Sequence, residues 1–330
     1  MATVSEGNLP APISLPSLEL TGQERDELGL VATQLACLGP GIADDVNWIA
    51  AARRLSCQVP VRLRETIRQY RHDCGPEAFL AIRNLPVDVA ALPATPTVRD
   101  SVERRTTVPA SVIALLASQL GEMISFRDEK LGALVQNVVP VPGMEASQSN
   151  AGSVDLEMHV ENAFHRSRPD YVTLLCLRGD YAGAAGTTVS SIRRALPLMP
   201  EHARRVLAEP RFVTQPPPSF RESTATPVHP VLMGNPADPD VRIDLAATVA
   251  LDEEAGQAME QLRDAFTLVA VAVVMRSGDL VFIDNRLALH GRSSFVPRYD
   301  GNDRWLHRSF VHLDSRRGRA DQFGESPVLN

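Results

Sequence analysis

Short β-prone segments, each bounded by Gly, Pro, Asn or Asp, fill the second part of the chain and limit its fold more than any other feature. They cover residues 131–141, 171–178, 186–192, 211–215, 241–245, 279–284 and 305–313. Only two helical stretches, at about 194–208 and about 252–275, interrupt them. Because many short strands with few helices between them disfavour a regular βαβ alternation, we predict a mainly β fold. An antiparallel sandwich or jelly roll at about 124–315 fits this pattern best.

Helical additions are expected mainly at 21–123, N-terminal to this core. Thr21 followed by Glu24 forms a capping-box pattern, which predicts a helix over about 22–37. The other expected elements of this part are helices at about 46–55, 61–74 and 109–123 and a buried strand at 77–84. Residues 1–20, rich in Pro and Ser, are expected to form an N-terminal arm, and residues 21–330 a single domain.

Charge and composition exclude several classes of protein. The 330 residues are 44% hydrophobic and contain 33 Lys and Arg against 40 Asp and Glu, a net charge of −7, so no basic field would attract nucleic acid. No stretch approaches the roughly 20 apolar residues that a bilayer requires. The four cysteines lack both C-x-x-C spacing and the density of a disulfide scaffold. We therefore expect a cytoplasmic, soluble protein with reduced thiols.

A His-x-Glu pair and a distant histidine suggest a metal site. His159 and Glu161 lie two residues apart, so on a β-strand both side chains would project from one face. His290, at the end of a short apolar run, could supply a third ligand from a neighbouring strand. Two imidazoles and one carboxylate on one side of an ion are the arrangement of non-haem Fe(II) oxygenases. His165 could replace one of these ligands, but only if the strand continued undisturbed.

Two arginines further along the chain are spaced so that they would lie on one face of a strand. Arg304 and Arg308 are four residues apart at the predicted strand 305–313 and would share one of its faces. Buried guanidiniums need carboxylate partners, and arginine binds carboxylates through two parallel hydrogen bonds. The pair therefore either binds a carboxylated small molecule or lies exposed on the surface, and spacing alone leaves both interpretations open.

Together these residues resemble the clavaminate synthase-like branch of the Fe(II)/2-oxoglutarate-dependent oxygenases, which includes asparagine, arginine and lysine hydroxylases. The resemblance spans about residues 120–315 and is most specific at 158–178, where His-Val-Glu-Asn-Ala-Phe-His runs on into Arg-Pro-Asp-Tyr-Val and Leu-Leu-Cys-Leu-Arg. This branch uses Glu where most of the superfamily has Asp. The resemblance implies a double-stranded β-helix core with Fe(II) held by His159, Glu161 and His290.

The resemblance also implies roles for other residues. Arg304 would hold the far carboxylate of 2-oxoglutarate together with the hydroxyl of Thr187, with Thr188 as the alternative. The positions that it assigns to the amino-acid substrate are Arg308 for the α-carboxylate, Glu129 and Asn150 for the amine and polar atoms, and Asp244 for the side chain. For Glu129, a charged surface turn is the other interpretation.

The implied reaction consumes O₂ and 2-oxoglutarate and hydroxylates a free L-amino acid, at Cβ or Cγ, in the biosynthesis of a peptide natural product. Arginine, lysine and asparagine are the leading substrates. A basic side chain is slightly preferred, because a buried Asp gains more from a cation than from an amide. The oligomeric state is left open, including a homo-oligomer.

Two other functions use the same residues. Two histidines, one carboxylate and a water also describe catalytic zinc sites, so a zinc hydrolase is one alternative. A hydrolase has no need of an anchor for 2-oxoglutarate at Arg304, however. The second alternative is a non-catalytic jelly-roll protein that binds a carboxylated ligand through Arg304 and Arg308.

Overall fold

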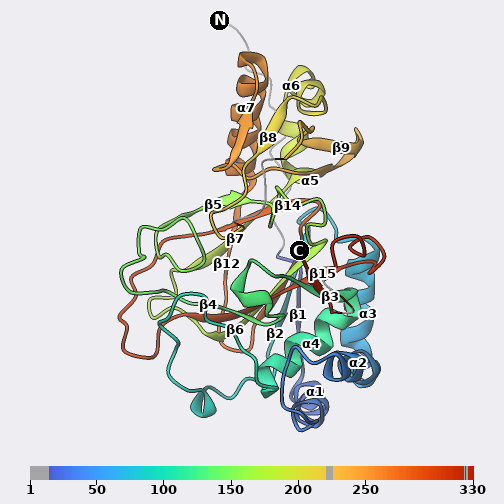
Figure 1. The fold of residues 1–330 in the computed structure, drawn as a ribbon, viewed down its shortest axis with the longest axis vertical. Coiled ribbons are helices and arrows are strands. Elements are labelled where there is room, and N and C mark those ends of the chain that lie inside the picture. Colours follow the sequence, from blue (N-terminus) through green and yellow to red (C-terminus); the bar gives the residue numbers. More distant parts are fainter. Residues whose placement is uncertain (1–14, 221–225, 323, 325) are drawn as a thin grey trace, which may run out of the picture.

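A computed structural model describes residues 15–220, 226–322, 324 and 326–330, and its largest element is a mixed β-sheet (Figure 1). The strands of this sheet run in the order β1-β2-β13-β6-β15-β3-β16, and β4 also pairs with β15. Their bounds are β1 Ser17–Glu19, β2 Phe79–Arg83, β3 Glu122–Phe126, β4 Gln136–Val138, β6 Tyr171–Arg178, β13 Leu280–Asp284, β15 Trp305–His312 and β16 Val328–Leu329. All eight residues of β6 and of β15 are buried, so these two strands form the centre of the sheet.

A second, antiparallel sheet has four strands in the order β12-β7-β14-β5. Their bounds are β5 Leu156–His159, β7 Gly186–Ser191, β12 Val271–Val274 and β14 Ala288–Arg292. The chain passes from the large sheet into this one over the three residues between β13 and β14. As a result, the candidate ligands on β5 and β14 are held by neighbouring strands of one sheet.

Four helices pack together on one side of the large sheet (Figure 1). They are α1 Gly22–Ala36, α2 Val46–Leu55, α3 Val61–His72 and α4 Val108–Leu120. The capping box predicted for α1 is present, because the Thr21 hydroxyl accepts from the Glu24 N–H while the Glu24 carboxylate accepts from the Thr21 N–H. α4 packs on β15 and β6 and is apolar almost all round, as expected of a helix between other helices and a sheet.

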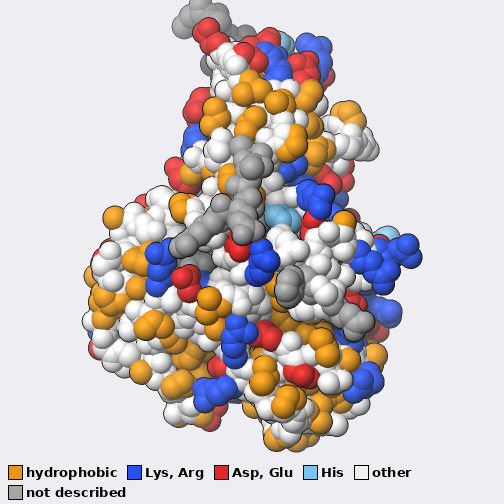
Figure 2. Space-filling model, viewed as in Figure 1, with side chains coloured by type: hydrophobic (Ala, Val, Ile, Leu, Met, Phe, Trp, Pro, Cys, Tyr) orange, Lys and Arg blue, Asp and Glu red, His pale blue; other side chains and the backbone are white. Residues whose placement is uncertain are grey.

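The remaining elements project from the second sheet, at the top of Figure 1. They are α5 Ile192–Ala195, α6 Glu201–Leu207, α7 Glu253–Val269, β8 Phe212–Thr214, β9 Leu232–Asn235, β10 Asp238–Val241 and β11 Thr248–Ala250. Short 3-10 turns occupy Ser56–Gln58, Val89–Ala91, Lys130–Gly132 and Leu196–Leu198. No described helix is long and apolar enough to cross a membrane. On the face drawn in Figure 2, basic and acidic side chains are interspersed, without a continuous basic surface.

Most of the elements predicted from the sequence are present, and the mainly β architecture is confirmed. β1 lies inside the predicted N-terminal arm and pairs in parallel with β2, while residues 1–14 of that arm lie outside the described residues. All four cysteines are free, as expected.

Four predicted elements are wrong in extent. The helix predicted at 252–275 ends at Val269, and β12 follows as the edge strand beside β7. The helix predicted at 194–208 is split into α5, a 3-10 turn and α6. Of the strand predicted at 241–245 only Val241 lies in a strand, as the last residue of β10. In the segment 131–141 only Gln136–Val138 is a strand. At its start, positive φ at Leu131 and Gly132 excludes extended backbone.

Candidate functional site

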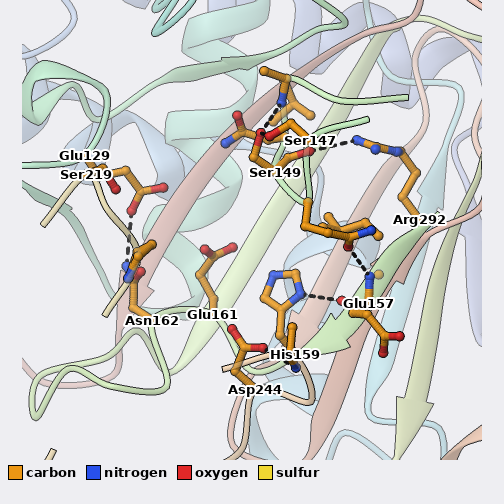
Figure 3. A pocket seen from close by; sticks show the side chains of 18 of the residues that line it. Glu129, Ser147, Ser149, Glu157, His159, Glu161, Asn162, Ser219, Asp244 and Arg292 are labelled. Atoms are coloured by element: carbon orange, nitrogen blue, oxygen red, sulfur yellow. Dashed lines mark hydrogen bonds between the residues drawn. The ribbon is translucent and has the colours of Figure 1, made fainter. Parts of the chain in front are cut away.

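A pocket of about 570 Å³ lies between residues of both sheets and the segment 143–154. Every residue that the sequence assigned to a metal, to 2-oxoglutarate or to an amino acid lines it. Figure 3 shows several of these side chains from close by.

The three predicted metal ligands meet in this pocket. One nitrogen each of His159 and His290 and one carboxylate oxygen of Glu161 lie within 4.8 Å of one another. The two histidines face each other across β5 and β14, with ring centres 4.5 Å apart. Glu161 does not share a strand with His159, however, because β5 ends at His159. The expectation that one strand face carries both side chains is therefore wrong, although a Glu161 carboxylate oxygen still lies 3.4 Å from the His290 Nε2.

Asn285 fixes the backbone of Glu161 beyond the end of the strand. The Asn285 side-chain oxygen accepts from the Glu161 N–H at 2.7 Å, and its amide nitrogen donates to the Glu161 carbonyl at 3.1 Å and to the Pro169 carbonyl at 2.8 Å. Asn285 is fully buried in the turn between β13 and β14. Sequence reasoning noted this turn only as the lead into His290, and the Asp-Asn-Arg sequence was the available signal for a side chain that bonds to backbone.

The protonation states of these side chains suit a metal. The His159 Nδ1–H donates to the Glu157 carbonyl at 2.9 Å, which leaves the Nε2 lone pair free. Burial lowers the pKa of His290, and the neighbouring His159 lowers it further, so its ring is neutral near pH 7. Burial opposes ionisation of Glu161, but Arg308 and His290 keep its pKa below the usual range. Two neutral imidazoles and one carboxylate are the donor set that Fe(II) accepts in oxygenases.

His165, the alternative ligand, does not join this group. Its Nε2 is hydrogen-bonded to the Asn330 carbonyl at 2.9 Å, and its ring packs edge-on against Phe126 at 4.8 Å.

Arg308 lies between two carboxylates in the pocket. Its Nη1 donates to Glu161 at 2.9 Å, its Nε donates to Gln136 at 3.0 Å, and its Nη2 pairs with Glu129. Glu129 also accepts from the Asn162 amide at 3.1 Å, as Figure 3 shows. Burial raises the pKa of Glu129 and the charge of Glu161 adds to this, while Arg308 opposes both. Glu129 is thus part of a buried charge network and not of an exposed turn.

The two predicted co-substrate residues lie beside β15 of the large sheet and on β7 of the second sheet. Arg304 is buried just before β15, and Thr187 is buried on β7. Thr187 lines the pocket, whereas Thr188 is not among the lining residues, as expected for neighbours on a strand.

Asn150 and Asp244 line the pocket from two loops. Asp244 forms an isolated bridge with His159, which places it beside the candidate metal ligands. One of its carboxylate oxygens accepts from the Ala246 and Ala247 N–H groups at 2.8 and 3.1 Å, and no described residue donates a hydrogen bond to the other oxygen.

Sequence reasoning missed two buried cations that line the pocket. Lys130 is buried and donates to the Asn137 carbonyl at 3.0 Å; burial and the nearby Arg308 lower its pKa to about 8. Arg292 is buried at the end of β14 and donates to the Val154 carbonyl at 2.8 Å. The signal for Arg292 was its position two residues after His290, on the same side of a strand.

Comparisons with known proteins agree with this geometry. Residues 110–310 match the family described as "Taurine catabolism dioxygenase TauD, TfdA family". The chain is 44% identical to the L-asparagine oxygenase of Streptomyces coelicolor over 323 residues, covering 98% of this chain and 97% of that protein. It is 33% identical to clavaminate synthase 2 of Streptomyces clavuligerus over 298 residues, covering 88% and 90%.

Solved structures are similar over nearly the whole chain. A structure of asparagine oxygenase with Fe(II), 2S,3S-3-hydroxyasparagine and succinate matches with a TM-score of 0.92 at 44% identity, covering 95% of this chain and 98% of that one. The non-heme iron oxygenase OrfP with Fe, succinate and (3S)-hydroxy-L-Arg matches with a TM-score of 0.87 at 28% identity, covering 96% and 100%.

Proposed function

The chain belongs to the TauD, TfdA family of dioxygenases, and on that basis we propose that it hydroxylates a free L-amino acid, using Fe(II), 2-oxoglutarate and O₂. Its similarity to clavaminate synthase 2 and to asparagine oxygenase confirms the resemblance seen in the sequence. In this proposal the core is a double-stranded β-helix, and residues 21–330 form a single oxygenase domain.

The observation that carries the proposal is the convergence of His159, Glu161 and His290 within 4.8 Å in the pocket. These three residues would hold the iron. When bound, the iron and 2-oxoglutarate supply the activation of O₂ that replaces a C–H bond by C–OH and releases succinate and CO₂. The protein binds and orients the substrate.

Arg304 and Thr187 would bind the far carboxylate of 2-oxoglutarate. Burial of the Arg304 guanidinium without an ion pair to any described carboxylate supports this role, because such a charge is costly unless an anion joins it. A zinc hydrolase would not need that anion site, and a simple carboxylate-binding protein would not need three convergent metal donors. These two features favour the oxygenase over both alternatives.

Arg308 and Glu129 would bind the α-carboxylate and the ammonium of the amino acid. Arg308 and Glu129 already form an ion pair, so they present a positive and a negative charge side by side. A zwitterionic amino acid can place its carboxylate against Arg308 and its ammonium against Glu129. Asn150 would add a polar contact, and the free oxygen of Asp244 would accept from the substrate side chain. Asparagine, arginine and lysine each offer N–H donors to that oxygen.

We put L-asparagine first among these substrates. The identity of 44% to an L-asparagine oxygenase, against 28% to OrfP, favours a carboxamide over a guanidinium. This choice replaces the slight preference for a basic side chain that came from Asp244 alone.

The test is a turnover screen of the twenty free L-amino acids with Fe(II) and 2-oxoglutarate. We expect succinate release coupled to a product one oxygen atom heavier than the substrate, with asparagine most active and arginine and lysine next. Succinate release without any heavier product from these three amino acids would contradict the substrate proposal. Hydrolysis supported by Zn²⁺ instead of Fe(II) would favour the hydrolase.

A matched pair of variants checks the side-chain contact. Asp244→Asn keeps the size but removes the charge, so selectivity among asparagine, arginine and lysine should shift away from the two basic amino acids. Asp264→Asn, on the surface of α7, should leave selectivity unchanged.

A further inference from the structure

Two buried arginines, Arg292 and Arg304, mark one end of the pocket as short of negative charge. Arg292 is 5% exposed and Arg304 is 6% exposed, and both line the pocket. Their guanidinium carbons lie 5.5 Å and 5.9 Å from the centre of the same ring, that of Phe295. In the described part of the chain neither forms an ion pair with a carboxylate. Since buried charge is costly without a counter-ion, this end of the pocket fits an anion.

The register of the second sheet directs Arg292 toward the site. Arg292 lies directly opposite Thr187 in the antiparallel pairing of β14 with β7, so both side chains project from the same face. His290 lies two residues before Arg292 on the same strand and shares that face. Arg292 is therefore on the wall that carries a candidate metal ligand and the hydroxyl assigned to 2-oxoglutarate.

The present contacts of Arg292 hold its side chain in place without neutralising it. Its Nη2 donates to the Val154 carbonyl at 2.8 Å, and its Nη1 donates weakly to the Ser149 carbonyl at 3.4 Å, as Figure 3 shows for Ser149. Its Nε is buried without a hydrogen-bond partner among the described residues. Backbone carbonyls orient the planar guanidinium, but they contribute no net charge.

We propose that Arg292 is a second guanidinium of the 2-oxoglutarate seat, acting with Arg304 and Thr187 on the carboxylate farthest from the metal. The inference rests on the proposed function, since it assigns a residue to the co-substrate of the same reaction. In this arrangement the Arg292 guanidinium faces the distal carboxylate of 2-oxoglutarate. Its hydrogen bonds to the Ser149 and Val154 carbonyls keep the guanidinium oriented.

The experiment compares two 2-oxo acids that differ only at the far end. 2-Oxoglutarate carries the distal carboxylate, whereas 2-oxopentanoate has the same carbon chain with a methyl group there. Dissociation constants of both are measured anaerobically on the Fe(II)-loaded protein by calorimetry, for the wild type, Arg292→Gln and Arg292→Lys. Arg276→Gln, an exposed arginine outside the pocket, is the matched control.

We expect Arg292→Gln to weaken 2-oxoglutarate about tenfold or more and 2-oxopentanoate less than about twofold, because only the first loses a charge-assisted contact. Arg292→Lys should keep most of the preference for 2-oxoglutarate, and Arg276→Gln should change neither constant. If Arg292→Gln does not fold by circular dichroism, Arg292→Met carries the same comparison.

Three results would overturn the inference. Equal weakening of both acids would make Arg292 a residue that only supports the segment 149–154, and unchanged binding of both would remove it from the seat. If the wild-type protein with Fe(II) bound neither acid, the proposed function would itself fail, and that outcome is distinct from a failure confined to the variants.

Discussion

His307 and Arg308 are neighbours on β15, yet they face opposite sides of the large sheet and differ in almost every contact. Arg308 faces the pocket, where its guanidinium bonds to Glu129, Gln136 and Glu161. His307 faces away from the pocket, toward the side that α4 covers, and neither of its ring nitrogens has a partner among the described residues. The polar group on the pocket face therefore has hydrogen-bond partners and faces a space for ligands. The polar group on the helix face is packed in the core without such partners.

The helix face carries further polar atoms of this kind. Thr173 of β6 and Ser309 of β15 lie directly opposite each other, and both hydroxyls are buried without a partner within the described ranges. An unsatisfied buried polar atom costs on the order of 1–3 kcal/mol. The two faces thus predict different phenotypes: changes on the pocket face should alter binding and turnover, and changes on the helix face should alter stability alone.

The largest expected effect is on the pocket face, at Glu161. Glu161→Ala removes the only carboxylate among the three candidate ligands, so turnover should fall at least about a thousandfold and Fe(II) binding should weaken with it. Succinate formation and metal content of the purified protein measure this. Glu260→Ala, exposed on α7, should keep full activity. Retained turnover in Glu161→Ala would break the assignment.

Arg308→Met should affect both binding and stability. It leaves Glu129 and Glu161 buried without their shared counter-ion, which should lower the free energy of unfolding by about 3 kcal/mol and raise the KM for the amino acid about a hundredfold. Denaturant titration and steady-state kinetics measure these changes. Arg53→Met removes a partly exposed ion pair with Glu122 and should cost less than about 1 kcal/mol. A similar cost for both variants would argue against a buried network.

His307→Leu should change only stability, and chiefly in acid. Burial lowers the pKa of His307 from 6.5 to about 3, so between these pH values the unfolded chain binds a proton that the folded chain excludes. Stability therefore falls as the pH drops through this window and is unaffected by His307 above it. In His307→Leu, the free energy of unfolding should depend less steeply on pH between about 3 and 6.5, by up to about 1.4 kcal/mol per pH unit. Turnover should be unchanged.

Denaturant titrations from pH 4 to 7 check the slope. The control is His202→Leu, because His202 is largely exposed on α6 and should leave the slope nearly as it is. An unchanged slope in His307→Leu would mean that the buried ring takes up its proton in the folded state.

The smallest expected effect is a difference in KM for 2-oxoglutarate between variants of the adjacent residues Thr187 and Thr188. Thr187→Val removes a hydroxyl from the pocket wall and should raise the KM for 2-oxoglutarate about fivefold, the value of one neutral hydrogen bond. Thr188→Val makes the same change on the other face of β7 and should leave this KM unaltered. A larger effect of Thr188→Val would reverse the assignment that the pocket supports.

Local sequence predicted those elements whose ends carry their own signals. β6 was predicted with its full bounds because an apolar run stands between Pro169-Asp170 and Gly179-Asp180, and α1 because Thr21 and Glu24 form its capping box. β12 was not predicted, since Val271–Val274 continues an apolar helical pattern and becomes a strand only by pairing with β7, about 80 residues earlier in the chain.

The candidate site was predicted where residue type alone is informative. His159, Glu161 and His290 were found from their chemistry and from the resemblance, although Glu161 lies beyond the strand that was expected to hold it. Arg292 was missed because an arginine at a strand end is ordinarily solvent-exposed, and only its burial and its register with Thr187 distinguish it.

An anaerobic titration of Fe(II) into the protein with 2-oxoglutarate tests the central claim most directly. If His159, Glu161 and His290 hold the metal and Arg304 holds the co-substrate, one equivalent of Fe(II) per chain should produce the weak visible charge-transfer band of the iron–2-oxoglutarate chelate, and Glu161→Ala should abolish it. No band in the wild type, or an equal band in Glu161→Ala, would contradict the account.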